Sequence, residues 1–205
     1  MSEADKARWD QRYRDGAYST RHAPSVLLTH WVPRIDTDSP RALDVACGAG
    51  RNAIFLSGMG FEVVAVDVSA VALERGSAKA LEENRSVQWY QHDLDSGLPL
   101  TSPFDLGFDL IIVVRYADTG LVQTLTERLA PGGMLLVEAH LGGPVFHEAT
   151  KPLGGPSSER FRLAPGTLAA SCADLETLYV NEGLVADPDG TLMALSQIVA
   201  RKHPH

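Results

Sequence analysis

The 205-residue sequence contains only two cysteines, Cys47 and Cys172. Their spacing matches neither a disulfide framework nor a metal-binding motif. The chain also lacks any apolar run of the roughly 20 residues that a transmembrane helix needs. Its first ten residues are mostly polar and charged, where a secretory signal would have an apolar core. These absences predict a cytoplasmic protein with reduced thiols, no metal site and no membrane partner.

Basic residues are scarce, with 18 Lys and Arg against 26 Asp and Glu and a formal net charge of −8. A chain of this charge repels polyanions, and no basic cluster interrupts the acidic balance. We therefore expect no nucleic-acid partner. The composition is otherwise ordinary, since 44% hydrophobic and 21% charged residues are typical of soluble globular proteins.

Strand-like and helix-like segments alternate along the chain, which is the pattern of a parallel sheet covered on both faces. The expected strands are 41–46, 61–67, 87–92, 108–114, 134–139, 175–182 and 191–202. The expected helices are 4–14, 24–31, 51–58, 69–83 and 119–129. An Asp-Gly turn between the last two strand-like runs predicts a hairpin. The pattern thus predicts a Rossmann-like, doubly wound α/β fold with seven strands, mostly parallel, that ends in an antiparallel hairpin.

We expect a single domain over residues 1–205 with four functional parts. The parts are a helical cap segment (1–35), a cofactor-binding core (41–140), a lid loop (141–165) and a C-terminal helix with the hairpin (166–205). The lid is expected because glycine and proline are frequent there, at the end of the sheet where ligands bind. Pro131-Gly132-Gly133 is expected to form the turn between the last core helix and the fifth strand.

A glycine turn, Gly48-Ala49-Gly50, follows the first expected strand. Such a turn lets the backbone approach a ligand closely, and the helix that follows offers unpaired N–H groups. The pattern also fits the dinucleotide fingerprint of NAD and FAD domains. Asp44, four residues before Gly48, would repel a pyrophosphate but attract an ammonium or sulfonium group. S-adenosylmethionine carries both of these cations, so the sequence favours it over a dinucleotide.

Two further acids stand at expected strand ends. Asp67 ends the second strand, about where a ribose-binding acid is expected, and suits a ribose diol. Asp93 and Leu94 follow the third strand and offer an acid and an apolar neighbour for an adenine amino group and ring. Each acid alone is more readily explained as a helix cap or a solvated loop residue. Their occurrence in order at three successive strand ends favours a cofactor site.

The glycine turn and the three acids resemble the class I S-adenosylmethionine-dependent methyltransferases, and the resemblance covers most of the chain. It implies a methionine-binding set, a ribose-binding acid and an adenine-binding pair, which are Asp44 with Gly48 and Gly50, then Asp67, then Asp93 with Leu94. We expect the neighbours of these residues to line the cofactor as well, namely Ala46, Cys47, Arg51, Asn52, Val68, Ser69 and Val114. The reaction product would be S-adenosylhomocysteine.

The flanking segments resemble a narrower group, the tellurite-resistance type of small methyltransferases. The residues that carry this likeness are Trp9 to Tyr13, Pro24-Ser25, Arg51-Asn52 after the second glycine, and Phe161 to Leu168. The resemblance implies a small, soft acceptor such as a thiol or a selenium or tellurium oxyanion. The sequence departs from these relatives at 184–186, where apolar residues replace a basic pair. The sequence therefore supports the prediction of methyl transfer more strongly than the prediction of a metalloid acceptor.

In-line methyl transfer needs a nucleophile held about 3 Å from the methyl group, and a dedicated base is optional. Arg115 and Tyr116, just past the fourth strand, are the first candidates to face that methyl group. His140, at the end of the fifth strand, could act as a base near neutral pH, although a structural histidine is the simpler reading. The alternative, non-catalytic interpretation is that Arg115 is an exposed loop residue and that Tyr116 is a packed side chain.

The N-terminal segment offers groups that could close over the site and hold an anionic acceptor, namely Arg12, Tyr13, Arg21 and His22. A solvated helix and loop is the plainer interpretation of these residues. The fourth strand lacks an Asn-Pro-Pro-Tyr motif, which disfavours DNA bases and protein amides as acceptors.

The sequence leaves two other functions open. The first is a noncatalytic module that binds S-adenosylmethionine and regulates a partner, and the second is an NAD-dependent oxidoreductase. Asp44 and the terminal hairpin disfavour the oxidoreductase. We expect a monomer or a homodimer that acts on a small-molecule methyl acceptor.

Overall fold

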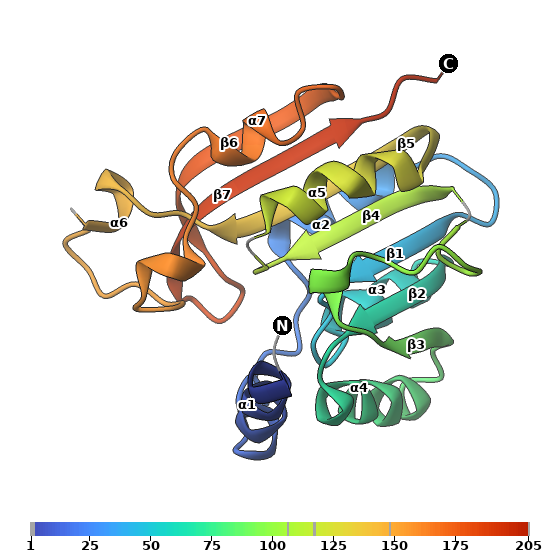
Figure 1. Ribbon diagram of the computed structural model, residues 1–205, viewed down its shortest axis with the longest axis horizontal. Coiled ribbons are helices and arrows are strands. Elements are labelled where there is room, and N and C mark those ends of the chain that lie inside the picture. Colours follow the sequence, from blue (N-terminus) through green and yellow to red (C-terminus); the bar gives the residue numbers. More distant parts are fainter. Residues whose placement is uncertain (1–2, 106, 117, 148, 205) are drawn as a thin grey trace.

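A computed structural model of the protein describes residues 3–105, 107–116, 118–147 and 149–204. It contains a seven-stranded sheet in the order β3-β2-β1-β4-β5-β7-β6. The strands are β1 (Arg41–Val45), β2 (Glu62–Asp67), β3 (Val87–Gln91), β4 (Phe108–Val114), β5 (Leu129–His140), β6 (Glu176–Ala186) and β7 (Leu192–Arg201). The pairs among β1 to β5 are parallel, whereas β7 is antiparallel to both β5 and β6 (Figure 1). The expected fold class is confirmed.

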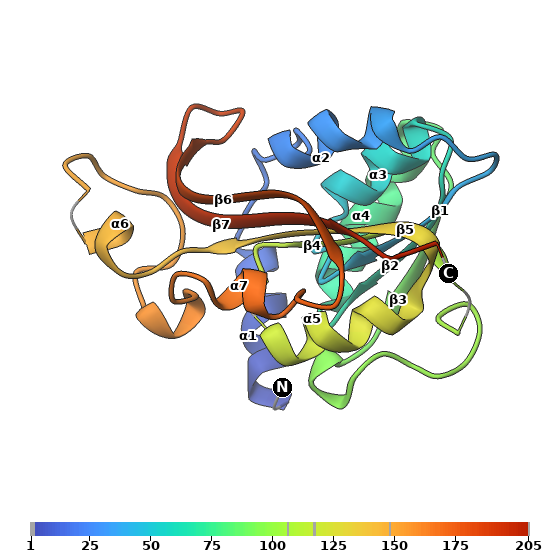
Figure 2. The same cartoon turned by 90° about the horizontal axis from the view of Figure 1, so that it is seen from above.

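Helices cover both faces of this sheet. They are α1 (Glu3–Arg14), α2 (Val26–Trp31), α3 (Arg51–Gly58), α4 (Ala70–Glu82), α5 (Thr119–Leu125), α6 (Pro144–His147) and α7 (Thr167–Ala170), with short 3-10 turns η1 (Val32–Arg34), η2 (Leu94–Ser96), η3 (Thr126–Arg128) and η4 (Glu159–Phe161). In Figure 2, α2 and α3 lie on one face of the sheet, and α5 and α7 lie on the other. The chain thus has the three layers that an alternating strand and helix pattern predicts.

The core divides into one apolar layer on each face. On the α5 side, Leu43 and Ile111 pack with Leu125, and on the α3 side, Leu110 packs with Leu56. The central strand β4 contributes to both layers, which explains its nearly continuous apolar sequence. The edge strand β6 is mostly exposed or half-buried.

The expected turn at Pro131-Gly132-Gly133 was wrong, because these residues lie inside β5. The register with β4 shifts there, from Phe108 opposite Leu129 to Leu110 opposite Met134. The Gly132 N–H donates to the Lys202 carbonyl, and the Lys202 N–H donates to Gly133, so the irregular segment follows the end of β7. A bulge accommodates a proline within a strand. The preceding helix is correspondingly shorter than expected, since α5 ends at Leu125 and η3 follows it.

The strand order reverses between β1 and β4, which places a topological switch point at the centre of the sheet. Open α/β sheets bind ligands at such a point, beyond the carboxyl ends of the strands. The residue after each of these strands has a left-handed backbone without being glycine, with φ of 55° at Ala46 and 67° at Arg115. Such strained residues gather at functional sites. The ends of β1 and β4 are therefore the expected place for a ligand-binding site.

Two features are absent from the described residues, a membrane-spanning helix and a metal-binding cluster. Within the described part of the chain, no helix combines the length and apolar character that crossing a membrane requires. The same residues contain no group of three His, Cys, Asp or Glu side chains placed to hold a metal ion.

Candidate active site

The glycine turn between β1 and α3 is packed between two aromatic side chains. Gly48 and Gly50 both have a left-handed backbone, with φ of 56° and 72°. A Cβ added to Gly48 would overlap the Tyr13 hydroxyl of α1, and one added to Gly50 would overlap the Trp89 ring of β3. Glycine is therefore required at both positions for conformation and for space. Tyr13, expected near the acceptor, covers the turn itself.

Asp67 ties the end of β2 to this turn. One carboxylate oxygen accepts a hydrogen bond from the Gly48 N–H and the other accepts one from the Ser69 N–H, each at 2.8 Å. Burial raises the pKa of Asp67, although these backbone donors oppose that effect. Each carboxylate oxygen can accept a second hydrogen bond, so Asp67 retains acceptors for a ribose hydroxyl.

Asp44 lies beneath the turn with only 1% of its surface exposed. The backbone N–H of Ala53 in α3 favours the charged form of Asp44. Its Oδ2 atom is buried and has no hydrogen-bond partner among the described residues. Burial raises the pKa of Asp44 from 3.8 to about 8, and the nearby charge of Asp67 adds to the rise. A buried oxygen without a donor is a place where a cationic ligand group would be stabilised.

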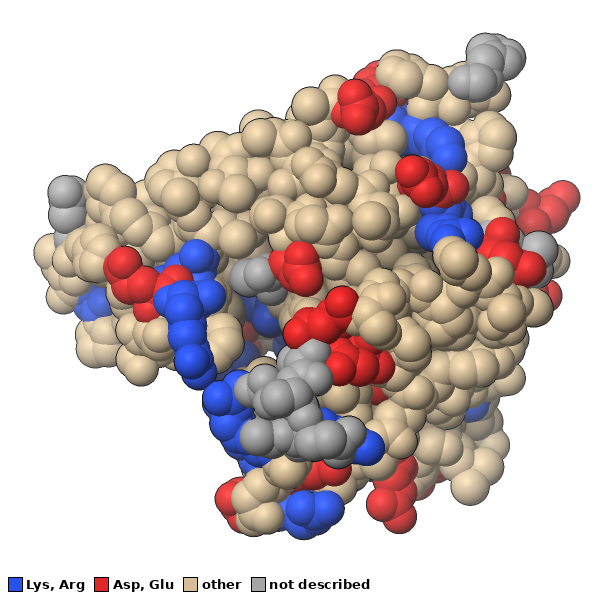
Figure 3. Space-filling view, in the orientation of Figure 1, with Lys and Arg blue, Asp and Glu red and all other residues tan. Residues whose placement is uncertain are grey.

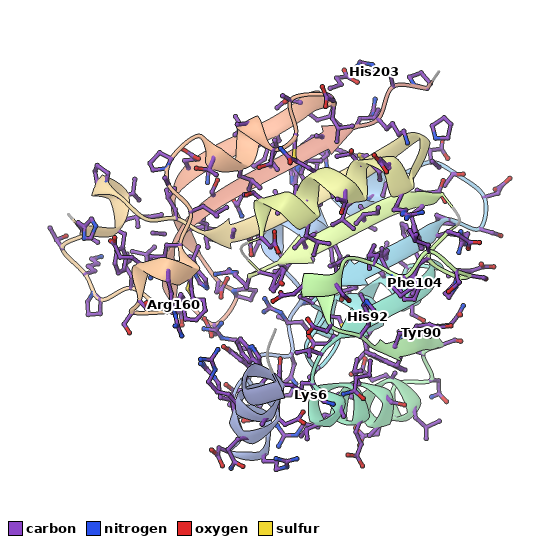
Figure 4. The ribbon with its side chains drawn as sticks, in the orientation of Figure 1. Lys6, Tyr90, His92, Phe104, Arg160 and His203 are labelled. Carbon is purple, nitrogen blue, oxygen red and sulfur yellow. The ribbon has the colours of Figure 1, made fainter. Side chains whose placement is uncertain are left out.

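The end of β3 forms the side of the site expected to hold adenine. Asp93 caps η2 by accepting a hydrogen bond from the Asp95 N–H at 3.0 Å, and Leu94 is buried. Figure 4 shows the neighbouring Tyr90, His92 and Phe104 on this side of the sheet, where Tyr90 packs edge-on against Phe104 with ring centroids 5.1 Å apart. Asp93 thus caps η2 and also lies just beyond the end of β3, where the adenine is expected.

Val68, Ser69 and Val114 lie where the strand ends meet the site. Val68 and Val114 are buried beside the ends of β2 and β4. Ser69 caps α4 by accepting a hydrogen bond from the Ala72 N–H at 3.2 Å, and its hydroxyl donates to Asp10 of α1 at 2.6 Å. This contact fixes α1 at the rim of the site.

Arg51 and Asn52 hold the N-terminal segment, which we call the strap and define as residues 20–25. Arg51 donates to the Ala23 carbonyl at 3.0 Å, and the Asn52 side-chain oxygen accepts from the Ser25 N–H at 2.9 Å. We expected both residues at the cofactor, but their observed contacts are with the strap. The Arg-Asn pair that follows the second glycine therefore closes the N-terminal segment over the sheet.

Cys47 stands in the turn between Ala46 and Gly48. Its N–H donates to the Val66 carbonyl at 3.0 Å, which continues the pairing of β1 with β2. Burial, followed by the charges of Asp44 and Asp67, raises the pKa of the Cys47 thiol well above its usual range. The side chain is therefore a neutral thiol and not an activated nucleophile.

Arg115 joins a buried ion-pair network at the end of β4. Its Nε donates to Glu138 at 2.8 Å and its Nη2 donates to Asp187 at 2.6 Å. Glu138 also accepts hydrogen bonds from Gln197 at 2.6 Å and from the Ser25 hydroxyl at 3.3 Å. The network links β4, β5, the strap and the hairpin turn.

Sequence reasoning missed Glu138, Gln197 and Asp187. Glu138 lies in an otherwise apolar strand, and that charged residue at a buried position was the available signal. Asp187 was interpreted only as a turn residue. Its burial depends on the hairpin folding back toward the end of β4, which the local sequence does not specify.

The two other candidate catalytic side chains point to different parts of the site. The Tyr116 hydroxyl lies 3.5 Å from Asp95, next to η2, and burial raises its pKa. His140 is 8% exposed, and its Nδ1 atom has no hydrogen-bond partner in the described part of the chain. Burial lowers the pKa of His140 from 6.5 to about 3, with added repulsion from Arg115 and other arginines. His140 is thus a neutral imidazole near pH 7 and a weaker base than we expected.

The segment expected to be a lid, 141–165, extends beyond the ends of β5 and the hairpin (Figure 1). Arg162 organises it by donating to the Leu141 carbonyl at 3.0 Å and to the Pro156 carbonyl at 2.7 Å. Its guanidinium also lies 3.5 Å from the Phe146 ring centroid. Gly155 packs against the His140 ring so closely that an added Cβ would overlap it. The segment therefore covers one side of His140.

A cavity of about 250 Å³ lies between the strap and the hairpin turn. Its walls are formed by Thr20, Arg21, His22, Ala23, Arg51 and residues 187–189. Arg21 approaches Asp187 at 4.0 Å and Asp189 at 3.9 Å. Arg12, also expected at the acceptor, instead donates to the Tyr18 hydroxyl at 3.2 Å and lies 5.0 Å from the Trp9 ring centroid. In Figure 3, basic and acidic side chains both border the hollow between α1 and the lobe formed by 141–165.

Known methyltransferases are similar to this chain in sequence. Residues 42–133 match the family model described as a methyltransferase domain. A protein-L-isoaspartate O-methyltransferase from Bordetella petrii is 31% identical over 140 residues, which are 64% of this chain and 50% of that protein. A probable thiol methyltransferase 2 from Arabidopsis thaliana is 26% identical over 158 residues, covering 71% of this chain and 69% of that protein. The chain spans about half the length of the first curated relatives it matches.

Solved structures show the same fold. TehB from Haemophilus influenzae matches with a TM-score of 0.67 and 21% identity, over 91% of this chain and 66% of that protein. Magnesium protoporphyrin IX methyltransferase from Synechocystis, solved with bound SAH, matches with a TM-score of 0.64 and 14% identity, over 85% of this chain and 80% of that protein.

Proposed function

We propose that this chain, a member of the class I S-adenosylmethionine-dependent methyltransferases, transfers the methyl group of that cofactor to a small molecule. The observation that carries the proposal is the set of residues that meet at the switch point, beyond the ends of β1 and β2. There the glycine turn, a hydrogen-bonded ribose-type acid and a buried acid with a spare oxygen converge. The terminal antiparallel hairpin belongs to the same fold and distinguishes it from an NAD domain.

The residues at the switch point fit S-adenosylmethionine. The spare Oδ2 of Asp44 suits a cationic group, and Asp67 retains acceptors for the ribose hydroxyls. Asp93 and Leu94 stand at the neighbouring strand end for the adenine. When bound, the cofactor supplies a methyl group already activated by its positive sulfur. The protein then has to orient an acceptor and exclude water, and such positioning is worth about 7–11 kcal/mol.

The acceptor we favour is a thiol. Arg115 is the cation nearest the end of β4, but Glu138 and Asp187 both contact it, so its charge is offset. A bare selenium or tellurium oxyanion would find little uncompensated positive charge there. His140, as a neutral imidazole, offers an uncharged nitrogen beside the same network. The likeness to a probable thiol methyltransferase supports this choice.

Titration calorimetry tests the cofactor assignment. The purified protein is titrated with S-adenosylmethionine, with S-adenosylhomocysteine and with NAD in parallel. We expect binding heat from the two sulfur compounds and none from NAD. Heat from NAD alone would overturn the proposal. Binding of the sulfur compounds without methyl transfer to any thiol would instead favour the noncatalytic regulatory module.

A further inference from the structure

We propose that the cavity between the strap and the hairpin turn binds an acceptor that carries an ammonium as well as an anionic group, as an aminothiol of the amino-acid type does. This inference rests on the proposed function and specifies its acceptor. It concerns the cavity of about 250 Å³ lined by Arg21, Arg51, Asp187 and Asp189. That volume is on the scale of a small amino acid.

The charges around the cavity are balanced. Arg21 and Arg51 supply guanidinium groups from the strap side and the start of α3, whereas Asp187 and Asp189 supply carboxylates from the hairpin turn. Behind this wall, Arg115 pairs with Glu138 and Asp187. A site for a bare anion would need an excess of positive charge, as would a site for phosphate. Opposite charges on facing walls suit a ligand that itself carries both signs.

Asp187 has an oxygen available for such a ligand. The residue is 8% exposed, and its Oδ1 accepts the hydrogen bond from Arg115. Its Oδ2 has no hydrogen-bond partner within the described residues, and the Arg21 Nη1 lies 4.0 Å away, beyond hydrogen-bond distance. Leaving a buried carboxylate oxygen without a donor is unfavourable, and a ligand ammonium would supply three donors.

The opposite wall has donors for an anionic group. Arg51 uses one terminal nitrogen to hold the Ala23 carbonyl, and a guanidinium has five N–H donors in all. Arg21 contacts the two turn carboxylates only at 3.9 and 4.0 Å, so it makes no tight ion pair with them. A ligand carboxylate could therefore bind these arginines without displacing a short hydrogen bond.

The cavity also adjoins the glycine turn and the end of β4, where the cofactor is expected. Arg51 is the residue directly after Gly50 of the glycine turn, and Asp187 is held by Arg115, which follows β4. An acceptor bound by its amino-acid end would extend its thiol toward the switch point. The acceptor sulfur, as a thiolate that has lost its proton to solvent, bonds to the methyl carbon. The bond from that carbon to the cofactor sulfur breaks, and its electron pair stays on that sulfur.

Four thiols of similar size separate the alternatives. Cysteine carries both charges, cysteamine only the ammonium, 3-mercaptopropionate only the carboxylate, and 2-mercaptoethanol neither. With S-adenosylmethionine as donor, we expect kcat/KM for cysteine to exceed that for each of the others by at least about tenfold, which corresponds to one well-made charged contact. An equal or higher value for 3-mercaptopropionate would overturn the proposal.

Asp189→Asn tests the carboxylate wall. The asparagine oxygen can keep the hydrogen bond that Asp189 accepts from the Thr191 N–H, so the turn is retained. We expect KM for cysteine to rise several-fold while KM for 3-mercaptopropionate stays unchanged. Asp38→Asn, at an exposed position in the loop before β1, is the matched control and should change neither value. Equal effects on both thiols would contradict an interaction between the ligand ammonium and this wall of carboxylates.

The methionine end of the cofactor also carries an ammonium and a carboxylate. A second measurement therefore distinguishes a site for the acceptor from a site for this end of the cofactor. S-adenosylhomocysteine is titrated into the wild type and into Asp189→Asn. Unchanged binding supports the acceptor site, whereas weakened cofactor binding with an unchanged thiol preference would assign the cavity to the cofactor and overturn the proposal. If no thiol is methylated at all, the proposed function fails separately. Cysteine is then titrated directly, and binding that Asp189→Asn weakens still supports the cavity, whereas no binding refutes it.

Discussion

At the scale of single residues, Asp67 has a structural and a proposed functional role. Its carboxylate holds the Gly48 and Ser69 N–H groups, and we assign its remaining acceptors to the cofactor ribose. Asp67→Ala should weaken S-adenosylhomocysteine binding by about 1–3 kcal/mol through lost hydrogen bonds. Calorimetry measures this change, and Asp67→Asn, which keeps one acceptor oxygen, should lose less. Unchanged affinity in the alanine variant would sink the ribose assignment.

Glu138 is the residue on which the ion-pair network depends. Glu138→Ala removes the partner of the Arg115 Nε and the acceptor for Gln197 in a site only 2% exposed. Breaking a buried pair from one side costs roughly 3–5 kcal/mol, and Asp187 remains to offset part of the Arg115 charge. Urea unfolding should show a loss toward the lower end of that range. Glu138→Gln keeps the hydrogen-bond acceptor and should lose less. Equal stability of all three proteins would contradict the network.

The sequence indicated some site residues better than others. The glycine turn and the acids at strand ends were predictable because local chemistry fixes them, through positive φ, close approach and position at the end of an apolar run. Arg51 and Asn52 were predicted to line the cofactor, whereas their observed contacts are with the strap and depend on residues more than 20 positions away. Asp187 acquires its role only when the hairpin brings it to Arg115. No local pattern contains that information.

At the scale of elements, side chains at the start of α3 hold the strap through specific hydrogen bonds, such as that from the Ser25 N–H to Asn52. Asn52→Ala would leave the Ser25 N–H buried without its acceptor, at a cost of about 1–3 kcal/mol. We expect faster amide hydrogen exchange in residues 20–25, with exchange in α5 on the other face unchanged. Mass spectrometry of proteolytic fragments reads both regions. Equal exchange in the strap of the variant and the wild type would show that other contacts hold it.

Element boundaries were predicted well where one signal dominated. The bounds of α3 and β4 agree with the expectation at both ends, because a glycine turn precedes α3 and a continuous apolar run makes up β4. The start of β5 was predicted five residues too late, since Pro131 and two glycines look like a turn when the pairing partner is unknown. β6 continues to Ala186, beyond the expected end, because the tight turn begins only at Asp187.

At the scale of the whole molecule, stability should depend on pH through two buried groups. His140 has a lower pKa in the folded protein than in the unfolded chain, so it reduces stability as the pH falls below 6.5 toward about 3. Asp44 has a raised pKa, so it reduces stability as the pH rises from 3.8 to about 8. The two effects oppose each other between about 4 and 6.5. Of these two effects, that of Asp44 continues above pH 6.5 and that of His140 does not.

The unfolding free energy should therefore fall between pH 6.5 and 8, because Asp44 is ionised in the unfolded chain but keeps its proton in the folded protein up to about pH 8. Urea titrations at several pH values measure this slope. Asp44→Asn cannot ionise and should flatten it, while His140→Gln should leave the slope in this range unchanged. A wild-type protein that gains stability over this interval would contradict the burial of an uncompensated Asp44.

The whole fold was predictable because the alternation of segments and the final hairpin allow few arrangements of a covered parallel sheet. The proposed acceptor cavity was less predictable than the fold, because it is assembled from the strap, the start of α3 and the hairpin turn. These elements are brought together only by the tertiary structure.

The most direct test of the central claim is methyl transfer itself. The protein is incubated with methyl-labelled S-adenosylmethionine and each of the four thiols, and mass spectrometry quantifies S-adenosylhomocysteine and the methylated thiol. We expect the two products in equal amounts, fastest with cysteine, and slower with the Asp67→Ala variant at a limiting cofactor concentration. S-adenosylmethionine that stays intact with every thiol, although the protein binds it, would contradict the assignment of this site to methyl transfer onto a thiol.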